Sequence, residues 1–303
     1  MDTRQLAAFC AVVERRSFSQ AAERLGVTQP AVSVQVRTLE ERFGQRLLDR
    51  SGRRVEPTEA GWRLYRSAQR VLQAEQQLWN DLDADDGAPL RGRLAVGAST
   101  GPGGRLVPRL ICEFAREHPA VEAELVISDT QSVIDRVSER ELELGIVGAS
   151  RRARGLEFEP LVRDEIVLAV PPGHRFSGET LDPAQLAGET LLDMQEGAGV
   201  RRVVEQELRR RSLRLAPRAR LELGLQESVK SAVAAGFGVG FISRNAIEDE
   251  LAAGTIAAAN VKGLEPSRQI YLVRSAARVL TRAAEAFAGF ARDRADFGQA
   301  ERR

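Results

Sequence analysis

The stretch from Ser17 to Arg54 constrains the fold of this chain more than any other part of its sequence. Two runs of apolar residues at helical spacing lie on either side of Gly26. They consist of Phe18, Ala21, Ala22 and Leu25, then Val32, Val36, Leu39 and Phe43. Glycine readily adopts the left-handed conformation that ends a helix and reverses the chain. The pattern therefore predicts a helix-turn-helix in which Val27 turns inward.

The starts of the two helices carry residues suited to that position. Ser19 and Thr28 are predicted N-caps, because their hydroxyl oxygens can accept bonds from free amides of the first turn. Pro30 is tolerated in the first turn, where its missing N–H would have no partner. At about 100° per residue, the face opposite the apolar one is free to enter a DNA groove. There Gln29 suits adenine and Val34 suits a thymine methyl group.

Arginines follow the second helix. Arg46, Arg50, Arg53 and Arg54 surround the turn at Ser51-Gly52, as in a wing of two short strands that brings cations to phosphates. The alternative is an ordinary helical hairpin with a solvated outer face. The whole chain has a net charge of +1, but residues 1–58 hold ten Arg against seven acidic residues. The predicted DNA-contacting residues are Ser19, Thr28, Gln29, Pro30, Ser33, Val34, Arg37, Arg50, Arg53 and Arg54.

A longer pattern makes the resemblance to a family specific. It reads FxxVxExxSFxxAAxxLxVxQPAxSxxxxxLExxxG from Phe9 to Gly44 and RxGRRVxxTxAG from Arg50 to Gly61. Residues 1 to about 65 thus resemble the winged helix-turn-helix of LysR-type transcriptional regulators. The resemblance implies a sequence-specific DNA-binding regulator with a periplasmic-binding-protein-like effector domain. Many relatives carry Arg or Lys where this chain has Val34, so base contact here is expected to depend more on Gln29 and Ser33.

A long helix is predicted from Thr58 or Glu59 to about Asp83, with an apolar stripe along it. The stripe either packs on its own small domain or pairs with the same helix of a second subunit. A helix of about 25 residues extends about 37 Å, which favours pairing and a two-fold symmetric DNA site. The predicted dimerisation residues are Leu64, Tyr65, Val71, Leu72, Leu78, Trp79 and Leu82, in a homodimer that pairs into a homotetramer.

After a hinge at residues 81–92, strand-like and helical runs alternate, which is typical of an α/β domain. Strands are predicted at 94–97, 124–128, 144–147, 165–170, 190–194, 220–224, 239–243 and 269–274. Helices are predicted to about 117 and at 131–140, 183–187, 200–211, 227–235 and 281–292. The fold class is α/β overall, with an N-terminal all-α winged helix-turn-helix, a long linker helix and a C-terminal two-lobed α/β effector domain. The expected domains are 1–58, 59–88 and 89–303, with lobe one at 93–164 and 267–295 and lobe two at 165–266.

Four loops between a strand and the next helix are candidates for an effector site. Such loops meet at the carboxyl ends of strands, where helix N-termini offer free amides. The candidates are Ser99, Thr100, Gly101, Ser128, Thr130, Gln131, Gly197, Arg201 and Gln226. Where many relatives read roughly GSGTR, this chain has Ala198 and Val200 in place of hydroxyl residues. Backbone amides and Arg201 can still face an anion, so an anionic small-molecule effector is among the candidates.

Other classes of function have weaker support. No nucleophile and base stand in a catalytic motif, so an enzyme carrying a DNA-binding module is disfavoured and no cofactor is expected. His118 and His174 stand alone, and Cys10 and Cys112 are predicted to be buried, so no metal site is expected. No apolar run reaches membrane-spanning length, which predicts a cytoplasmic protein. The open alternative is a ligand-independent DNA-binding protein whose α/β domain serves only oligomerisation.

Overall fold

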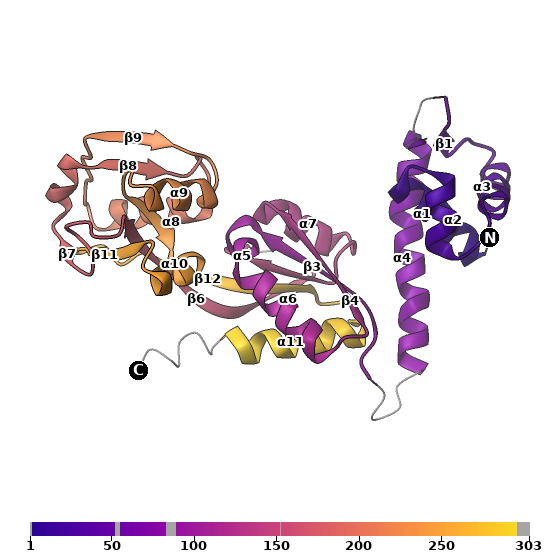
Figure 1. Cartoon of the computed structure of the whole chain (residues 1–303). Helices are drawn as coiled ribbons and strands as arrows, with labels where there is room; N and C mark the ends of the chain where they lie inside the picture. The colour runs from indigo at the N-terminus through magenta and orange to yellow at the C-terminus, as the bar shows by residue number, and fades with distance from the viewer. Residues whose placement is uncertain (1, 52–54, 83–88, 152, 296–303) are drawn as a thin grey trace. The chain divides into compact units, whose positions relative to one another are not determined.

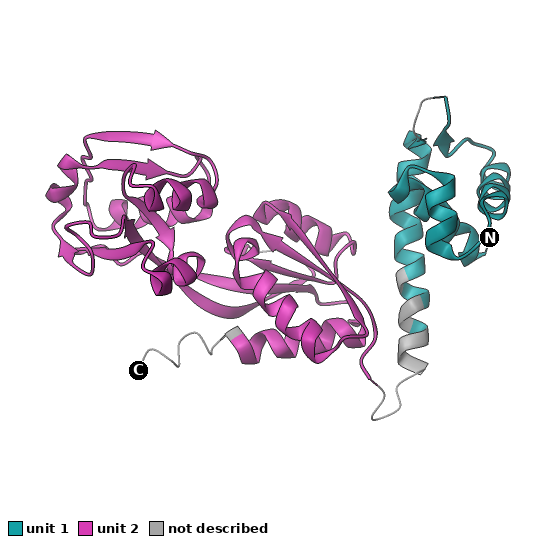
Figure 2. Cartoon of the chain, in the orientation of Figure 1, with its two compact units in different colours: residues 1–88 teal, residues 89–303 magenta. Residues whose placement is uncertain are grey.

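The computed structural model describes residues 2–51, 55–82, 89–151 and 153–295. The chain divides into two compact units, Met1–Ala88 and Pro89–Arg303, coloured separately in Figure 2. The first unit is mainly helical and the second is α/β, as Figure 1 shows, which confirms the predicted fold class.

The N-terminal unit is a winged helix-turn-helix. Its elements are α1 (Thr3–Arg15), α2 (Phe18–Leu25), α3 (Gln29–Phe43), β1 (Leu48–Asp49), β2 (Glu56–Pro57) and α4 (Glu59–Leu82). Gly26 ends α2 in the left-handed conformation, with φ 65°, and its N–H donates to the carbonyls of Ala22 and Glu23. The strands β1 and β2 pair antiparallel, as expected for a wing. Phe9, Val36 and Leu39 are fully buried between the three helices.

Two local predictions in this unit are wrong, and a third, the N-cap at Thr28, is confirmed only in its position. The N-cap of α2 is Ser17, whose hydroxyl accepts from the amide of Gln20 at 3.4 Å, whereas Ser19 lies one residue inside the helix and is exposed. Thr28 does occupy the N-cap position of α3, but its side chain makes no capping bond. Val27 is 44% exposed, because its backbone amide bonds to Ala22 without turning the side chain into the core.

The stripe on α4 is shared between two environments. Ala68 is buried, and Leu64, Tyr65 and Leu72 pack against the core of α1, α2 and α3. The Tyr65 hydroxyl also hydrogen-bonds Glu14 at 3.0 Å. These three predicted dimerisation residues therefore belong to the chain's own core, because α1 packs beside the first turns of α4. Val71 and Leu78 are 41% and 58% exposed, while the side chains of Trp79 and Leu82 lie outside the described residues.

The C-terminal unit is built on a mixed sheet with the strand order β4-β3-β5-β12-β6-β11-β7, in which β10 also pairs with β6. Its strands are β3 (Gly92–Ser99), β4 (Val121–Ser128), β5 (Leu144–Val147), β6 (Leu156–Val170), β7 (Thr180–Leu181), β8 (Thr190–Asp193), β9 (Ala219–Glu222), β10 (Gly240–Ser243), β11 (Ala257–Val261) and β12 (Ser267–Ser275). Its helices are α5 (Thr100–Gly104), α6 (Leu106–Glu117), α7 (Thr130–Ser138), η1 (Pro183–Gly188), α8 (Gly199–Arg210), α9 (Gln226–Ala234), η2 (Arg244–Ile247), α10 (Glu248–Ala253) and α11 (Arg282–Ala295).

This unit has two lobes with separate cores. In lobe one, α6 and α11 lie side by side (Figure 1), and Phe114 meets Phe287 edge to face at 5.3 Å between ring centroids. In lobe two, the core forms between β6, β8, β10 and the helices α8 and α9. The strand β6 runs through both lobes, pairing with β12 up to Glu165 and with β10 from Ile166 onward. The sheet is therefore continuous where the two lobes join.

Several elements differ from the sequence prediction. The strand β6 begins at Leu156, nine residues before the predicted start, and β11 was not predicted at all. β11 reads AAANV, and alanine and asparagine have low strand propensity. Cys112 is exposed on α6, which corrects the prediction that it is buried. Cys10 is buried, and burial raises the pKa of its thiol to about 12.

Gly61 provides a test of how α4 packs on the wing. A Cβ there would lie 2.1 Å from the carbonyl oxygen of Leu47, so Gly61→Ala must displace the start of α4. We expect it to lower the free energy of unfolding of the N-terminal unit by about 1–3 kcal/mol. The control is Gly289→Ala in α11, where a Cβ meets nothing within 4 Å. It should raise stability by about 0.4–1 kcal/mol. Hydrogen exchange in α1 and α11 peptides measures both effects, and equal effects of the two substitutions would contradict the packing.

Candidate functional site

The outer face of α3 carries the predicted base-reading residues at the surface. Val34 is 55% exposed, and Gln29 and Pro30 are exposed beside it. The Gln29 amide nitrogen donates to the Ser33 hydroxyl at 3.0 Å, which holds both polar groups together at the start of the helix. Arg37 also lies at the surface, within 3.4 Å of Glu41 one turn later. This face can present an amide, a hydroxyl and a methyl-bearing side chain to the edges of bases.

The arginines of the wing have different surroundings. Arg50 makes an ion pair with Glu40 at 3.0 Å, and its guanidinium lies 4.9 Å from the centre of the Phe18 ring. Glu40 also accepts from the backbone amides of Leu47 and Leu48. Arg50 thus fastens the wing to α2 and α3, which the sequence did not indicate. Arg53 and Arg54 lie outside the described residues, so their predicted phosphate contacts stay predictions.

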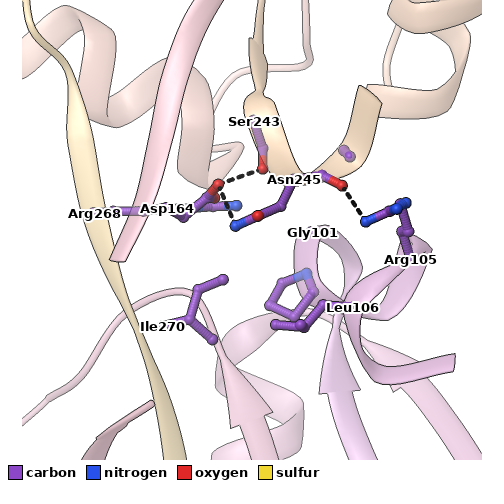
Figure 3. Close-up of a pocket in the computed structure, with 10 residues that line it drawn as sticks. Gly101, Arg105, Leu106, Asp164, Ser243, Asn245, Arg268 and Ile270 are labelled. Atoms are coloured by element: carbon purple, nitrogen blue, oxygen red, sulfur yellow. Dashed lines mark hydrogen bonds and ion pairs between the residues drawn. The ribbon is translucent and has the colours of Figure 1, made fainter. Parts of the chain in front are cut away.

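A buried ion pair lies where the two lobes of the C-terminal unit join. Asp164 on β6 and Arg268 on β12 stand directly opposite each other in the strand register, and Arg268 Nε donates to Asp164 Oδ2 at 2.9 Å. The side chains are 0% and 8% exposed, respectively. The other carboxylate oxygen of Asp164 accepts from Ser243 at 2.5 Å and from Asn245 at 3.2 Å, as Figure 3 shows. The carboxylate is therefore surrounded by donors from β12, β10 and η2.

A second polar contact, here termed the interlobe bridge, joins Arg105 of lobe one to three groups of lobe two. Arg105 donates to the carbonyl of Asn245 at 3.1 Å and to Glu248 at 2.7 Å. It also binds both carboxylate oxygens of Asp249 at 2.8 Å. The hydrogen bond from Arg105 lowers the pKa of Asp249, because it favours the charged carboxylate. The bridge holds one side of the cleft closed.

The space between the bridge and the ion pair is small. Gly101, Pro102, Leu106 and Ile270 line it together with the polar groups just described. Figure 3 shows Gly101, Leu106 and Ile270 beside those groups. The cavity has a volume of about 10 Å³. A cavity of this size holds about one water molecule. An organic molecule can enter here only after side chains or lobes move.

The nine predicted effector residues fall into two groups. The lobe-one residues Ser99 and Gly101 lie at the cleft: Ser99 is buried and accepts from the Gly148 amide at 3.1 Å, and Gly101 lines the cavity. Thr100 is exposed beside them, while Ser128 and Thr130 are partly exposed at the end of β4 and the start of α7. Gln131 bonds both carboxylate oxygens of Asp135 and accepts from Arg151, so its amide is already engaged.

In lobe two, Gly197 has φ 81° in the loop before α8, and Gln226 begins α9 with its amide oxygen buried and without a partner among the described residues. Arg201 does not fit its predicted role. Its guanidinium donates to the Met194 carbonyl and Glu222, both at 2.7 Å, and to Glu205 at 3.0 Å. These bonds raise the pKa of the Arg201 guanidinium, and the hydrogen bond with Glu222 is the largest cause. Arg201 therefore fastens α8 to β8 and β9, which leaves it little capacity to bind an anion.

Sequence reasoning missed Arg105 and Arg268, and it treated Asp164 only as a boundary between lobes. Asp164 and Arg268 are 104 positions apart, so no local spacing connects them. Within the described ranges, no group of three or more His, Cys, Asp or Glu side chains is placed to hold a metal ion. In the same part of the chain, no helix is long and apolar enough to cross a membrane.

Comparison with known proteins identifies the class. Residues 3–62 match the model of the bacterial regulatory helix-turn-helix protein, lysR family, and residues 87–296 match the LysR substrate binding domain. The chain belongs to the LysR family of transcriptional regulators. It is 32% identical over 288 residues to a RuBisCO operon transcriptional regulator of Allochromatium vinosum, covering 95% of this chain and 94% of the relative.

Solved structures share the fold. Full-length CbnR, solved in complex with its target DNA, has a TM-score of 0.66 at 24% identity and covers 97% of this chain and 99% of its own. The regulatory domain of CcmR from Synechocystis PCC6803, solved in complex with 2-PG, has a TM-score of 0.58 at 24% identity. It covers 67% of this chain and 97% of its own.

Arg105→Gln tests the interlobe bridge. Loss of the guanidinium should leave Glu248 and Asp249 without their cross-lobe donor. We therefore expect the rate of hydrogen exchange to rise about three- to tenfold in peptides of η2 and α10. This factor corresponds to the loss of about 1 kcal/mol for a partly exposed ion pair. The matched control is Arg109→Gln, one turn further along α6, where Arg109 pairs with Glu113 of the same helix at 2.8 Å. Unchanged exchange in η2 and α10 of the Arg105 variant would show that the bridge does not hold the lobes.

Proposed function

We propose that this LysR-family regulator binds its operator through α3 and the wing of two paired subunits, and that a small-molecule effector between the lobes changes that binding. The observation that carries the proposal is the coincidence of two family models with two compact units. In domain terms, residues 1–58 bind DNA, 59–88 link and dimerise, and 89–303 bind the effector. An effector that prefers one arrangement of the lobes shifts the population toward it.

The DNA-binding role is assigned to the exposed groups of α3. Gln29, Ser33 and Val34 address bases, whereas Arg37, Arg53 and Arg54 address phosphates. The experiment that tests it is titration of the purified protein with its own upstream DNA at several salt concentrations. Sequence preference and a falling log K with log salt support the proposal. Binding that ignores both sequence and salt would refute it.

The effector is proposed to be a small anionic metabolite held by Ser99, Thr100, Gly101, Ser128, Thr130 and Gly197. CcmR was solved with 2-PG, and several relatives are named as regulators of RuBisCO operons, which motivates a screen of phosphorylated and carboxylated compounds. We further propose that the chain catalyses no reaction, since the relative from Allochromatium vinosum is named as a transcriptional regulator. We also propose a cytoplasmic location, where a DNA-binding regulator meets its operator.

One observation favours a second candidate. The cavity near Arg268 is only about 10 Å³, which suits an α/β domain that serves oligomerisation and binds nothing. A thermal unfolding screen across metabolites separates the two, because a ligand that binds only the native state raises the unfolding midpoint. A midpoint raised by one compound, together with a changed affinity for operator DNA, supports the sensor. A flat response across the screen supports the oligomerisation domain.

Gln29→Ala is expected to relax base preference at one position of each half-site. Loss of a bidentate amide contact costs about 1–3 kcal/mol in discrimination against the wrong base. Arg54→Ala, which removes a phosphate contact, should instead weaken binding to all sequences and reduce the salt slope by about one. Binding to a library of operator variants measures both. Equal loss of selectivity in the two variants would contradict this division of roles.

Leu78→Glu is expected to convert the dimer to monomer and to lower operator affinity. Leu78 is 58% exposed on α4 and is not among the described residues that pack against the core of the N-terminal unit. Arg66→Glu is the control, since it changes charge on the same helix about 120° away from Leu78. Sedimentation velocity gives the oligomeric state. A dimer that survives Leu78→Glu and binds palindromic DNA normally would exclude α4 as the dimer contact.

A further inference from the structure

Only one of the three guanidinium nitrogens of Arg268 takes part in its ion pair with Asp164. Its Nε donates to Asp164, whereas Nη1 and Nη2 have no hydrogen-bond partner among the described residues. The side chain is nevertheless only 8% exposed. Neither nitrogen is among the fully buried side-chain atoms that lack a partner, so both reach the solvent of the small cavity that Arg268 lines. The two terminal nitrogens can therefore donate to a molecule placed in that cavity.

Three glycines surround these nitrogens. A Cβ at Gly101 would lie 2.7 Å from Nη2, and a Cβ at Gly148 or Gly199 would lie 3.0 or 2.8 Å from Nη1. None of the three has a positive φ, so backbone conformation does not explain the glycines. Gly101 lies in α5, which follows β3, Gly148 directly follows β5, and Gly199 begins α8 in lobe two. The absence of side chains at all three positions leaves room for the guanidinium, and the cavity beside it holds about one water molecule until the lobes or side chains move.

The electrostatics at this place favour an anion. Gly199 is the first residue of α8, a helix of 12 residues whose N-cap, Ala198, has no side chain to bond the first amides. The free amides and the helix dipole make this end positive. Among the residues that the structure describes, Asp164 is the one carboxylate paired with Arg268, and its two oxygens accept from Nε, Ser243 and Asn245. Nη1 and Nη2 thus retain their full capacity for a second acceptor.

We propose that Arg268 binds the carboxylate or phosphate group of the effector, with Nη1 and Nη2 donating to its oxygens and the first amides of α8 beside them. Two parallel N–H donors match two oxygens of either group. Asp164 positions the guanidinium from behind, and the buried Ser99 hydroxyl can add a donor because its oxygen already accepts from Gly148. This assignment rests on the proposed function, since it concerns the same cleft, and it places the main anion-binding group on the strand that joins the lobes.

The test uses the full-length protein with inorganic phosphate and with malonate, each compared with chloride at constant ionic strength. Calorimetric titration and thermal unfolding give the apparent Kd. Saturable binding of phosphate with no response to malonate assigns a phosphate group, and the reverse assigns a carboxylate. In Arg268→Gln the apparent Kd should rise about ten- to hundredfold, in line with about 1.5–3 kcal/mol for bonds to a charged group. The matched control, Arg163→Gln, changes an exposed arginine of β6 that donates to Ser267, and it should bind as the wild type does.

Arg268→Gln leaves Asp164 buried without its cation and can unfold the domain. Two further variants keep the assignment testable. Arg268→Lys keeps the charge but not the planar pair of donors, so it should bind the anion about three- to tenfold more weakly than the wild type. Gly199→Ala places a methyl group 2.8 Å from Nη1, which must displace the terminal nitrogens but leaves the charge of Arg268 in place, so it should weaken anion binding.

The proposal is overturned if neither anion binds the wild type, or if folded Arg268→Lys and Gly199→Ala both bind as the wild type does. Operator binding is measured on the same samples. Sequence-specific binding without any anion affinity refutes the role of Arg268 and leaves the DNA-binding regulator intact. Anion binding without sequence preference on DNA refutes the proposed function instead.

Discussion

The ion pair between Asp164 and Arg268 is the contact on which the arrangement of the C-terminal unit depends. It lies on the two strands, β6 and β12, that join the lobes, and it is buried almost completely. Removing two charges from water costs several kcal/mol per ion unless hydrogen bonds replace the lost hydration. Asp164 accepts those bonds from three elements, whereas the guanidinium donates only one. The pair is thus well compensated on its acidic side and poorly compensated on its basic side.

This asymmetry argues against a purely stabilising role. Apolar side chains of similar volume often stabilise a buried site as well as an ion pair does. What the pair does achieve is to hold a guanidinium in a fixed orientation, with its free edge toward glycines of both lobes. Fixed orientation is what a binding site needs, because a preorganised donor loses little entropy when the ligand arrives.

Local patterns were enough to predict much of the fold. Gly26 and the apolar spacing around it predicted the helix-turn-helix, and periodicity predicted most strands and helices of the C-terminal unit. The failures have physical causes. Val27 is exposed because the turn is completed by its backbone, and β11 has a single β-branched residue, Val261, among alanines and an asparagine. The α4 stripe predicted an apolar face but not its partner, which is α1 for Leu64, Tyr65 and Leu72.

The cleft was predicted better than its chemistry. Loops at the carboxyl ends of strands predicted where Ser99 and Gly101 lie, because that rule depends only on strand order. Arg201 was chosen for its place in a familiar loop, and its guanidinium is bound to Glu222 and Glu205. Arg268 was missed because its partner is distant in sequence and its strand reads as ordinary core. Charged residues acquire a role through contacts between distant segments, which one sequence does not reveal.

The interlobe bridge contributes to the free energy that an effector must supply to separate the lobes and enter the cavity. The cavity holds about one water, so a larger ligand has to separate Arg105 from lobe two or displace side chains around it. Asp249 is 75% exposed, and pairs exposed to this degree contribute about 0–1 kcal/mol. Glu248 is less exposed, at 25%, and adds a bond of the same kind. Opening the bridge therefore costs a few kcal/mol at most, whereas an anion on Arg268 gains about 1.5–3 kcal/mol for each charged bond. The free energy of opening the bridge and the free energy of binding the anion are therefore similar in size. A modest difference in ligand contacts then decides which arrangement of the lobes prevails.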